Sequence, residues 1–230
     1  MPPLLIYCYD AYCGWCYGFS PVMQQLEAQC RDILDVEVLS GGMILPEKPR
    51  HIGVIADHIR QSYPSIEAHT GISFGKDYLW HIHHPQDSDW FPCSEKPAIA
   101  LCIMKDIYPR LAVSFASALQ YALHFEGRDL CDDEAYRHLL NKFQIPVHMF
   151  YEKLHSTAYK EKAHYEFALC QQLKVTGFPA LFLQTAENRF YTIALGYTDY
   201  NTLQNRVEKV LREAEDNNGK DKIKIQSTGS

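Results

Sequence analysis

Cys13 and Cys16, separated by two residues, are the side chains of this sequence best placed to do chemistry. Residues 4–9 before them are apolar and aromatic without Pro or Gly, which predicts a short buried strand. Residues 17–30 after them predict a helix, so the two thiols are expected where a strand ends and a helix begins. The free N–H groups and positive dipole end of a helix start stabilise a thiolate. We therefore expect Cys13 to be a nucleophile and Cys16, one turn later, to resolve a mixed disulfide.

A zinc site is the alternative use of two such cysteines. A zinc ribbon needs a second pair of ligands at suitable spacing, and the sequence has no second C-x-x-C. The stretch from His81 to His84, with Asp87 and Asp89 nearby, also carries metal-binding residue types, but no defined ligand set completes it and the stretch reads as a loop. We therefore predict redox chemistry and no metal. The other six cysteines stand singly in the sequence: Cys8, Cys30, Cys93, Cys102, Cys131 and Cys170.

The composition is that of an ordinary folded protein, with 230 residues, 47% hydrophobic residues and a formal net charge of -6. An acidic chain argues against nucleic acid or an anionic membrane as the main partner, because both attract basic surfaces. No apolar stretch approaches the length of a transmembrane helix, and no basic segment followed by an apolar run marks a secretory signal. These features predict a cytoplasmic location, where most of the eight cysteines stay reduced.

The remaining elements predict an α/β arrangement with a large helical insertion. A second strand at residues 35–40 completes a strand–helix–strand unit with parallel pairing. Residues 53–156 contain helical patterns and no convincing strand. A helix at 157–173, an antiparallel hairpin with strands at 180–183 and 190–195, and a closing helix at 200–213 follow.

Four short motifs show a resemblance to a known family. They are the segments Asp10 to Phe19 around the cysteines, Val175 to Pro179, Gly41 to Met43, and Gly71 to Gly75. On these the chain resembles the DsbA-like branch of the thioredoxin superfamily, and within it the FrnE-type proteins and bacterial predicted protein-disulfide isomerases. The resemblance implies a thioredoxin fold with a helical insertion subdomain.

The predicted domains follow from this fold. Residues 1–48 and 156–214 are expected to form the thioredoxin-like domain, and residues 49–155 the inserted helical subdomain. Residues 215–230 are polar and charged and contain a glycine, so we expect a flexible tail.

The resemblance also implies roles for individual residues. Cys13 would attack a substrate disulfide, Cys16 would resolve the mixed disulfide, and Pro179 would follow a cis peptide bond facing the two sulfurs. The backbone of Phe178, with Gly177, would pair with an extended substrate. Substrates would be protein or small-molecule thiols and disulfides, with Tyr12 and Trp15 in contact with them. No external cofactor is implied, although glutathione or a thioredoxin-type protein must reset the pair.

Two positions depart from the pattern of the superfamily. Tyr7 stands six residues before the first cysteine, where thioredoxins and many DsbA proteins carry a buried carboxylate. Asp10 is a candidate proton relay in its place, or equally a structural cap. The residues between the cysteines are Gly14 and Trp15, which leads us to expect an intermediate redox potential.

Two other functions remain open at this stage. A glutathione-dependent transferase or isomerase of the kappa-class type would share the fold, but such proteins use a serine at the position of Cys13 and need no Cys16. A peptide-binding chaperone would use the aromatic residues around the cysteines, and its activity would survive the loss of both thiols. The sequence does not determine the direction of electron transfer or the oligomeric state.

Overall fold

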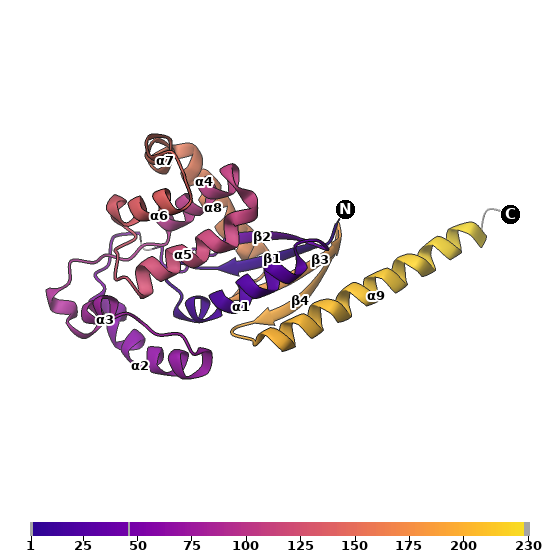
Figure 1. Ribbon diagram of the computed structural model, residues 1–230, viewed down its shortest axis with the longest axis horizontal. Coiled ribbons are helices and arrows are strands. Elements are labelled where there is room, and N and C mark those ends of the chain that lie inside the picture. The colour runs from indigo at the N-terminus through magenta and orange to yellow at the C-terminus, as the bar shows by residue number, and fades with distance from the viewer. Residues whose placement is uncertain (1, 46, 228–230) are drawn as a thin grey trace.

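A mixed four-stranded sheet forms the centre of the computed structural model, which describes residues 2–45 and 47–227 (Figure 1). The strand order is β2-β1-β3-β4. Strand β1 (Leu4–Tyr9) pairs in parallel with β2 (Asp35–Ser40) and antiparallel with β3 (Ala180–Ala186). Strand β4 (Arg189–Leu195) pairs antiparallel with β3. The predicted strands and their pairing are confirmed, with β3 and β4 each longer than expected.

Both faces of the sheet are covered by helices, which explains why β1 is an uninterrupted apolar run. Leu5, Tyr7 and Tyr9 face one side and belong to the main core with α1 (Gly14–Cys30) and the buried side of α9 (Tyr200–Ser227). Ile6 and Cys8 face the other side and pack against α8 (Thr157–Gln172). Strand β1 is therefore buried from both sides, and its last residues lead directly into the dithiol.

The predicted helical insertion is confirmed between β2 and α8. Figure 1 shows α2 and α3 together at the end of the molecule away from the end of α9, with α5 beside α1. The helices of the insertion are α2 (Gly53–Thr70), α3 (Lys76–His83), α4 (Glu95–Ile107), α5 (Ala112–His124), α6 (Arg137–Lys142) and α7 (Val147–Leu154). Three short 3-10 helices accompany them at Pro85–Asp87, Pro109–Leu111 and Asp133–Tyr136.

The histidine-containing segment was expected to be a loop, and that expectation is wrong. Lys76–His83 form helix α3, which buries Tyr78 and Ile82, one turn apart. Two apolar residues at this spacing give the helix one buried side, and Pro85 follows shortly after its end. Gly71 caps the C-terminus of α2, because it has φ 74° and its N–H donates to the carbonyl of Glu67.

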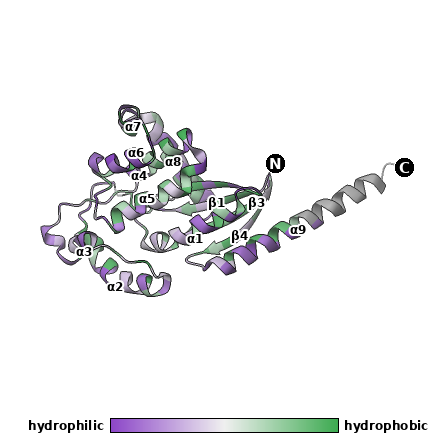
Figure 2. Cartoon of the chain, viewed as in Figure 1, coloured by the Kyte–Doolittle hydropathy of each residue, from purple (hydrophilic) through white to green (hydrophobic). Residues whose placement is uncertain are grey.

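The closing helix α9 is longer than predicted. It continues to Ser227, so the predicted flexible tail differs from the structure over residues 215–227; residues 228–230 of that tail lie outside the described residues. The first part of α9 buries Leu203 and Val207. Figure 2 shows hydrophilic and hydrophobic residues alternating along this part of the helix, as expected for an amphipathic helix. The segment after it contains Glu, Lys and Gln, which have good helix propensity. The other domain boundaries stay predictions. Within the described residues, no helix has the length and apolar character needed to cross a membrane.

Candidate active site

The dithiol lies at the start of α1, and Cys13 is the N-cap residue of that helix. Its backbone is extended, with φ -80° and ψ 111°, and its Sγ accepts a hydrogen bond from the N–H of Cys16 at 3.4 Å. The thiol also donates to the carbonyl oxygen of Phe178 at 3.4 Å. The helix begins at Gly14, three residues earlier than predicted. The Cys13 sulfur therefore contacts the helix start on one side and the loop before β3 on the other.

The two cysteines differ in burial, and this separates their chemistry. Cys13 is 7% exposed, whereas Cys16 is 0% exposed. Burial raises the pKa of the Cys16 thiol well above its usual range, and the hydrogen bond and charge of Cys13 act in the same direction. Cys16 is thus held as a thiol behind its partner. Of the two, Cys13 is the one whose sulfur a molecule outside can reach.

The peptide bond between Phe178 and Pro179 is cis, which confirms the prediction made for Pro179. Pro179 is buried and its carbonyl accepts a hydrogen bond from the N–H of Gly196 at 2.7 Å. The Phe178 ring lies over Gly41, where an added Cβ would come within 1.9 Å of the ring. Gly177 is exposed. In this loop the Phe178 carbonyl therefore faces Cys13, while the Phe178 ring packs against the backbone at the end of β2.

Asp10 connects three segments around the dithiol. Its Oδ1 accepts from the Tyr12 N–H at 3.0 Å and from the Ser94 hydroxyl at 2.9 Å, and its Oδ2 accepts from the Met43 N–H at 2.7 Å. Burial raises its pKa, while these hydrogen bonds oppose the rise. Ser94 occupies the N-cap position of α4, but its side chain makes no cap hydrogen bond there and is bonded to Asp10 instead. The geometry favours a structural cap for Asp10, and its role as a proton relay stays a prediction.

Tyr7 replaces the carboxylate of the superfamily with a phenol. Its side chain is 2% exposed, and its hydroxyl makes no hydrogen bond with any part of the chain that the structure describes. Burial raises the pKa of Tyr7 well above its usual range, with the charges of Cys16 and Cys13 as the next causes. The phenol therefore stays neutral and cannot accept a proton from the resolving thiol as a carboxylate does.

An apolar cavity of about 410 Å³ opens beside Cys13. Two of the predicted substrate-binding residues, Tyr12 and Trp15, line it together with Cys13, whereas Gly177 and Phe178 lie outside its lining. Its wall is completed by the insertion, through Ile55, Ile59 and Tyr63 of α2 among others. Sequence reasoning missed these residues. Their spacing of four residues marks one side of a helix, but it does not indicate what that side faces.

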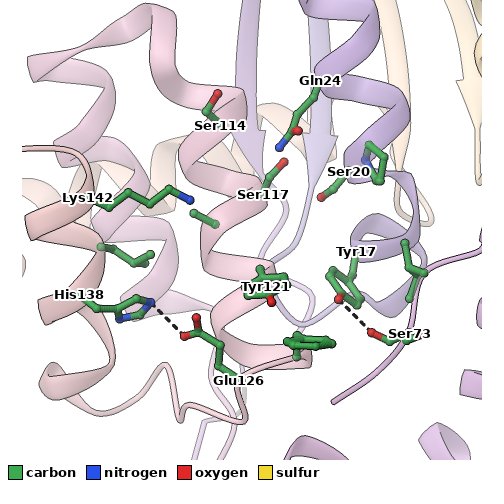
Figure 3. Close-up of a pocket in the computed structure, with 15 residues that line it drawn as sticks. Tyr17, Ser20, Gln24, Ser73, Ser114, Ser117, Tyr121, Glu126, His138 and Lys142 are labelled. Atoms are coloured by element: carbon green, nitrogen blue, oxygen red, sulfur yellow. Dashed lines mark hydrogen bonds and ion pairs between the residues drawn. The ribbon is translucent and has the colours of Figure 1, made fainter.

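A second pocket lies between α1, α5 and α6 (Figure 3). Tyr17 is one of the residues that line it, whereas Cys13 and Cys16 are not. Serine and glutamine side chains point into it, and the Tyr17 hydroxyl donates to the Ser73 carbonyl at 3.1 Å. His138 pairs with Glu126 at 3.0 Å on its far side. The pocket is thus separate from the dithiol.

The histidines from His81 to His84 do not converge. The His81 ring stacks on Trp90 with centroids 3.9 Å apart, and its Nδ1 is 2.7 Å from the Ser88 hydroxyl. The ring of His84 stacks on Trp80, and His83 lies edge-on to Tyr63. Among residues 2–45 and 47–227, no group of three or more His, Cys, Asp or Glu side chains has the arrangement of a metal site.

Comparisons with known proteins agree on the fold. No protein-family model matches the chain, and no curated protein matches it. Among solved structures, a "putative protein disulfide isomerase" from Nitrosomonas europaea is 23% identical, with 93% of this chain and 99% of that chain covered and a TM-score of 0.80. The cytosolic disulfide reductase DsbM from Pseudomonas aeruginosa is 27% identical, with 91% and 98% covered and a TM-score of 0.73. The oxidoreductase NmDsbA1 from Neisseria meningitidis is 9% identical, with 95% and 86% covered and a TM-score of 0.55.

The chain has the DsbA-like form of the thioredoxin fold. The likeness spans nearly the full length of each chain compared, so it includes the helical insertion as well as the sheet. Within this fold the dithiol occupies the junction of β1 and α1, opposite the cis peptide bond.

Proposed function

We propose that this DsbA-like protein is a thiol–disulfide oxidoreductase that acts through Cys13 and Cys16. One observation carries the proposal: Cys13 caps α1 and offers the outer sulfur, while the fully buried Cys16 lies one turn behind and donates its backbone N–H to that sulfur. A helix N-terminus stabilises the thiolate that the first step needs. The enzymatic activity of the structural relatives supports the same chemistry.

The reaction balances within the dithiol. The Cys13 thiolate attacks one sulfur of a substrate disulfide, forms a mixed disulfide and releases the other sulfur as a thiolate with the bonding electron pair. Cys16 then loses its proton and attacks the Cys13 sulfur, which releases the second substrate sulfur and leaves a Cys13–Cys16 disulfide. The substrate gains two electrons and two protons, and the protein loses them. The raised pKa of Cys16 makes loss of its proton the demanding part of the second step.

The substrate is held on both sides of Cys13. The Phe178 carbonyl, which faces the Cys13 sulfur, accepts a hydrogen bond from an extended substrate, with Gly177 exposed beside it and Pro179 fixing the loop. Tyr12 and Trp15 contact the substrate from the cavity. The roles of these residues agree with those implied by the family resemblance.

We assign the net direction as reduction, in the cytoplasm, with glutathione as the reductant. The support is the 27% identity to a protein described as a cytosolic disulfide reductase, whose structure has also been solved with GSH. Two glutathione thiols would reduce the Cys13–Cys16 disulfide and leave as glutathione disulfide. No other cofactor is required by this scheme.

The test is the redox equilibrium of the two thiols in glutathione buffers, measured by alkylation and mass spectrometry. A reversible two-electron transition confined to Cys13 and Cys16 is expected, and its midpoint ranks reductase against oxidase. Cys16→Ser should accumulate a mixed disulfide on Cys13, Cys13→Ser should abolish exchange, and Cys93→Ser is the matched control that should change neither. If glutathione conjugates are made and no Cys13–Cys16 disulfide forms at any buffer ratio, the kappa-class alternative replaces the proposal. Retained peptide binding with no redox transition would favour the chaperone alternative.

A further inference from the structure

The cavity beside Cys13 is built in advance of any ligand. Phe74 and Tyr78 stack with centroids 5.7 Å apart, and Tyr78 contacts Trp90 at 6.2 Å. All three rings are buried at 7% exposure or less. Their packing fixes one wall of the cavity, and α2 and the N-terminus of α1 supply the others. A volume of about 410 Å³ lies within the range of small-molecule sites and is ample for an aromatic ring.

The lining of this cavity is uncharged. None of the described residues that form it is Lys, Arg, Asp or Glu, and its polar side chains are those of Ser62, His58 and the tyrosines and tryptophans. Glutathione carries two carboxylates and an ammonium group. Moving such charges into an apolar cavity without partners is costly, so the cavity disfavours the charged arms of glutathione. An uncharged apolar group gains free energy there as its surface leaves water.

The position of Cys13 in the lining decides which part of a substrate enters. A molecule bonded to the Cys13 sulfur has the Phe178 carbonyl on one side, 3.4 Å from that sulfur, and the cavity on the other. The backbone of a peptide suits the carbonyl, whereas a group attached close to the reacting sulfur suits the cavity. The carbonyl and the cavity can therefore bind two different parts of the same substrate.

We propose that the cavity selects disulfides that carry a bulky apolar group close to the reacting sulfur, and that glutathione reacts without using the cavity. This inference rests on the proposed oxidoreductase function and names its substrate class. The group comes either from an apolar residue next to a cysteine in a polypeptide or from the body of an apolar small thiol. Both sources share the same chemistry, and the reaction with Cys13 is the disulfide exchange described above.

The experiment uses mixed disulfides that share one coloured leaving group, 5-thio-2-nitrobenzoate. The reduced protein attacks the other sulfur, and the coloured thiolate is released, so one absorbance trace reports one turnover. The probes are the disulfides of a Phe-Cys dipeptide amide, a Gly-Cys dipeptide amide, benzyl mercaptan and glutathione. Rates are divided by those with a free model thiol, which removes differences in intrinsic reactivity.

The Phe-Cys probe is expected to react about tenfold faster than the Gly-Cys probe, since burying an aromatic side chain is worth at least the ~1.4 kcal/mol that a factor of ten represents. Ile59→Ser makes the α2 wall polar, and Ser62→Phe fills the space with an added ring; both should remove this preference. Ile33→Ser, at a side chain 55% exposed and outside the cavity lining, is the matched control that keeps the preference. The glutathione probe should react at the same rate in the parent protein and in Ile33→Ser.

The outcomes separate the two proposals. Preference for both Phe-Cys and benzyl mercaptan, lost in the two cavity variants, supports the inference for the shared chemistry. Preference for only one of them supports it and identifies the source as polypeptide or small thiol. Equal rates for Phe-Cys, Gly-Cys and benzyl mercaptan overturn the cavity's role and leave the oxidoreductase function standing. Failure of every probe to react, in a protein whose melting curve is normal, overturns the function itself.

Discussion

His124 is expected to make the stability of the fold depend on pH between about 3 and 6.5. The imidazole is 1% exposed at the end of α5, and neither ring nitrogen makes a hydrogen bond with the described residues. Its ring stacks on Tyr17 at 5.1 Å and lies edge-on to Phe74 and Tyr78. Burial lowers the pKa of His124 to about 3, with the backbone of Ala11 opposing the change. The folded protein therefore holds this histidine neutral.

The sign and size follow from the two pKa values. In the unfolded chain the imidazole titrates near its usual pKa of about 6.5. Below that pH the imidazole binds a proton in the unfolded state but not in the folded state. The free energy of unfolding is therefore highest above about pH 6.5 and falls as the pH drops towards 3. At about 1.4 kcal/mol per unit, the upper limit of the loss is roughly 5 kcal/mol.

The assay compares urea unfolding of the protein and of His124→Phe at pH 7, 6, 5 and 4. Other titrating groups affect both proteins, so the difference between the two free energies of unfolding isolates the imidazole. The phenylalanine variant should gain stability relative to the parent by about 1.4 kcal/mol for each pH unit below 6.5. Parallel curves across the whole range would refute the reasoning, because they would mean that His124 titrates alike in the folded and unfolded states.

Three further substitutions test other parts of the structure. Lys105→Met removes the cation that pairs with the buried carboxylate of Glu166 and with the half-exposed carboxylate of Glu37. Loss of the buried pair should cost about 3–5 kcal/mol of unfolding free energy, whereas Lys209→Met in an exposed pair should change it by less than about 1 kcal/mol. Gly41→Ala forces the Phe178 ring to move, so we expect a loss of about 1–3 kcal/mol in melting experiments and slower disulfide exchange, with normal exchange as the contradicting result. Tyr7→Phe removes a buried hydroxyl without a hydrogen bond and should leave stability unchanged or raised by up to about 1 kcal/mol, while a clear loss would show that the hydroxyl is bonded.

The sequence predicted most of the sheet because its strands combine apolar content with clear turn signals. Residues 4–9 form a buried run bounded by polar or proline residues, and both bounds of this strand are confirmed. The cis bond before Pro179 was implied by a motif of only five residues, and it too is confirmed. These features depend on local sequence or on a short sequence motif. They can therefore be predicted from the sequence without knowledge of contacts between distant segments.

The features that the sequence did not predict depend on contacts between distant segments. Helix α3 was missed because its polar residues outnumber the two, Tyr78 and Ile82, that are buried against other elements. Ser94 has the sequence position of an N-cap, yet its hydroxyl is bonded to a carboxylate 84 residues away. The cavity was missed for the same reason, since α2 lies far from the dithiol in the sequence and only the folded chain brings Ile59 to face it.

Asp10 shows how position near a reactive thiol differs from participation in its chemistry. A proton relay must alternate between a charged and a protonated form. Each form needs hydrogen-bond partners of its own, donors for the carboxylate and an acceptor for the protonated acid. The three donors that face this carboxylate, from Tyr12, Ser94 and Met43, all suit the charged form. If Asp10 were protonated, the oxygen that carries the proton would face a donor instead of accepting a hydrogen bond from it. The loop that carries Met43 lies next to Gly41, which supports the Phe178 ring. The same hydrogen bonds that join these loops around the dithiol therefore hold Asp10 in one state, which favours positioning over proton transfer.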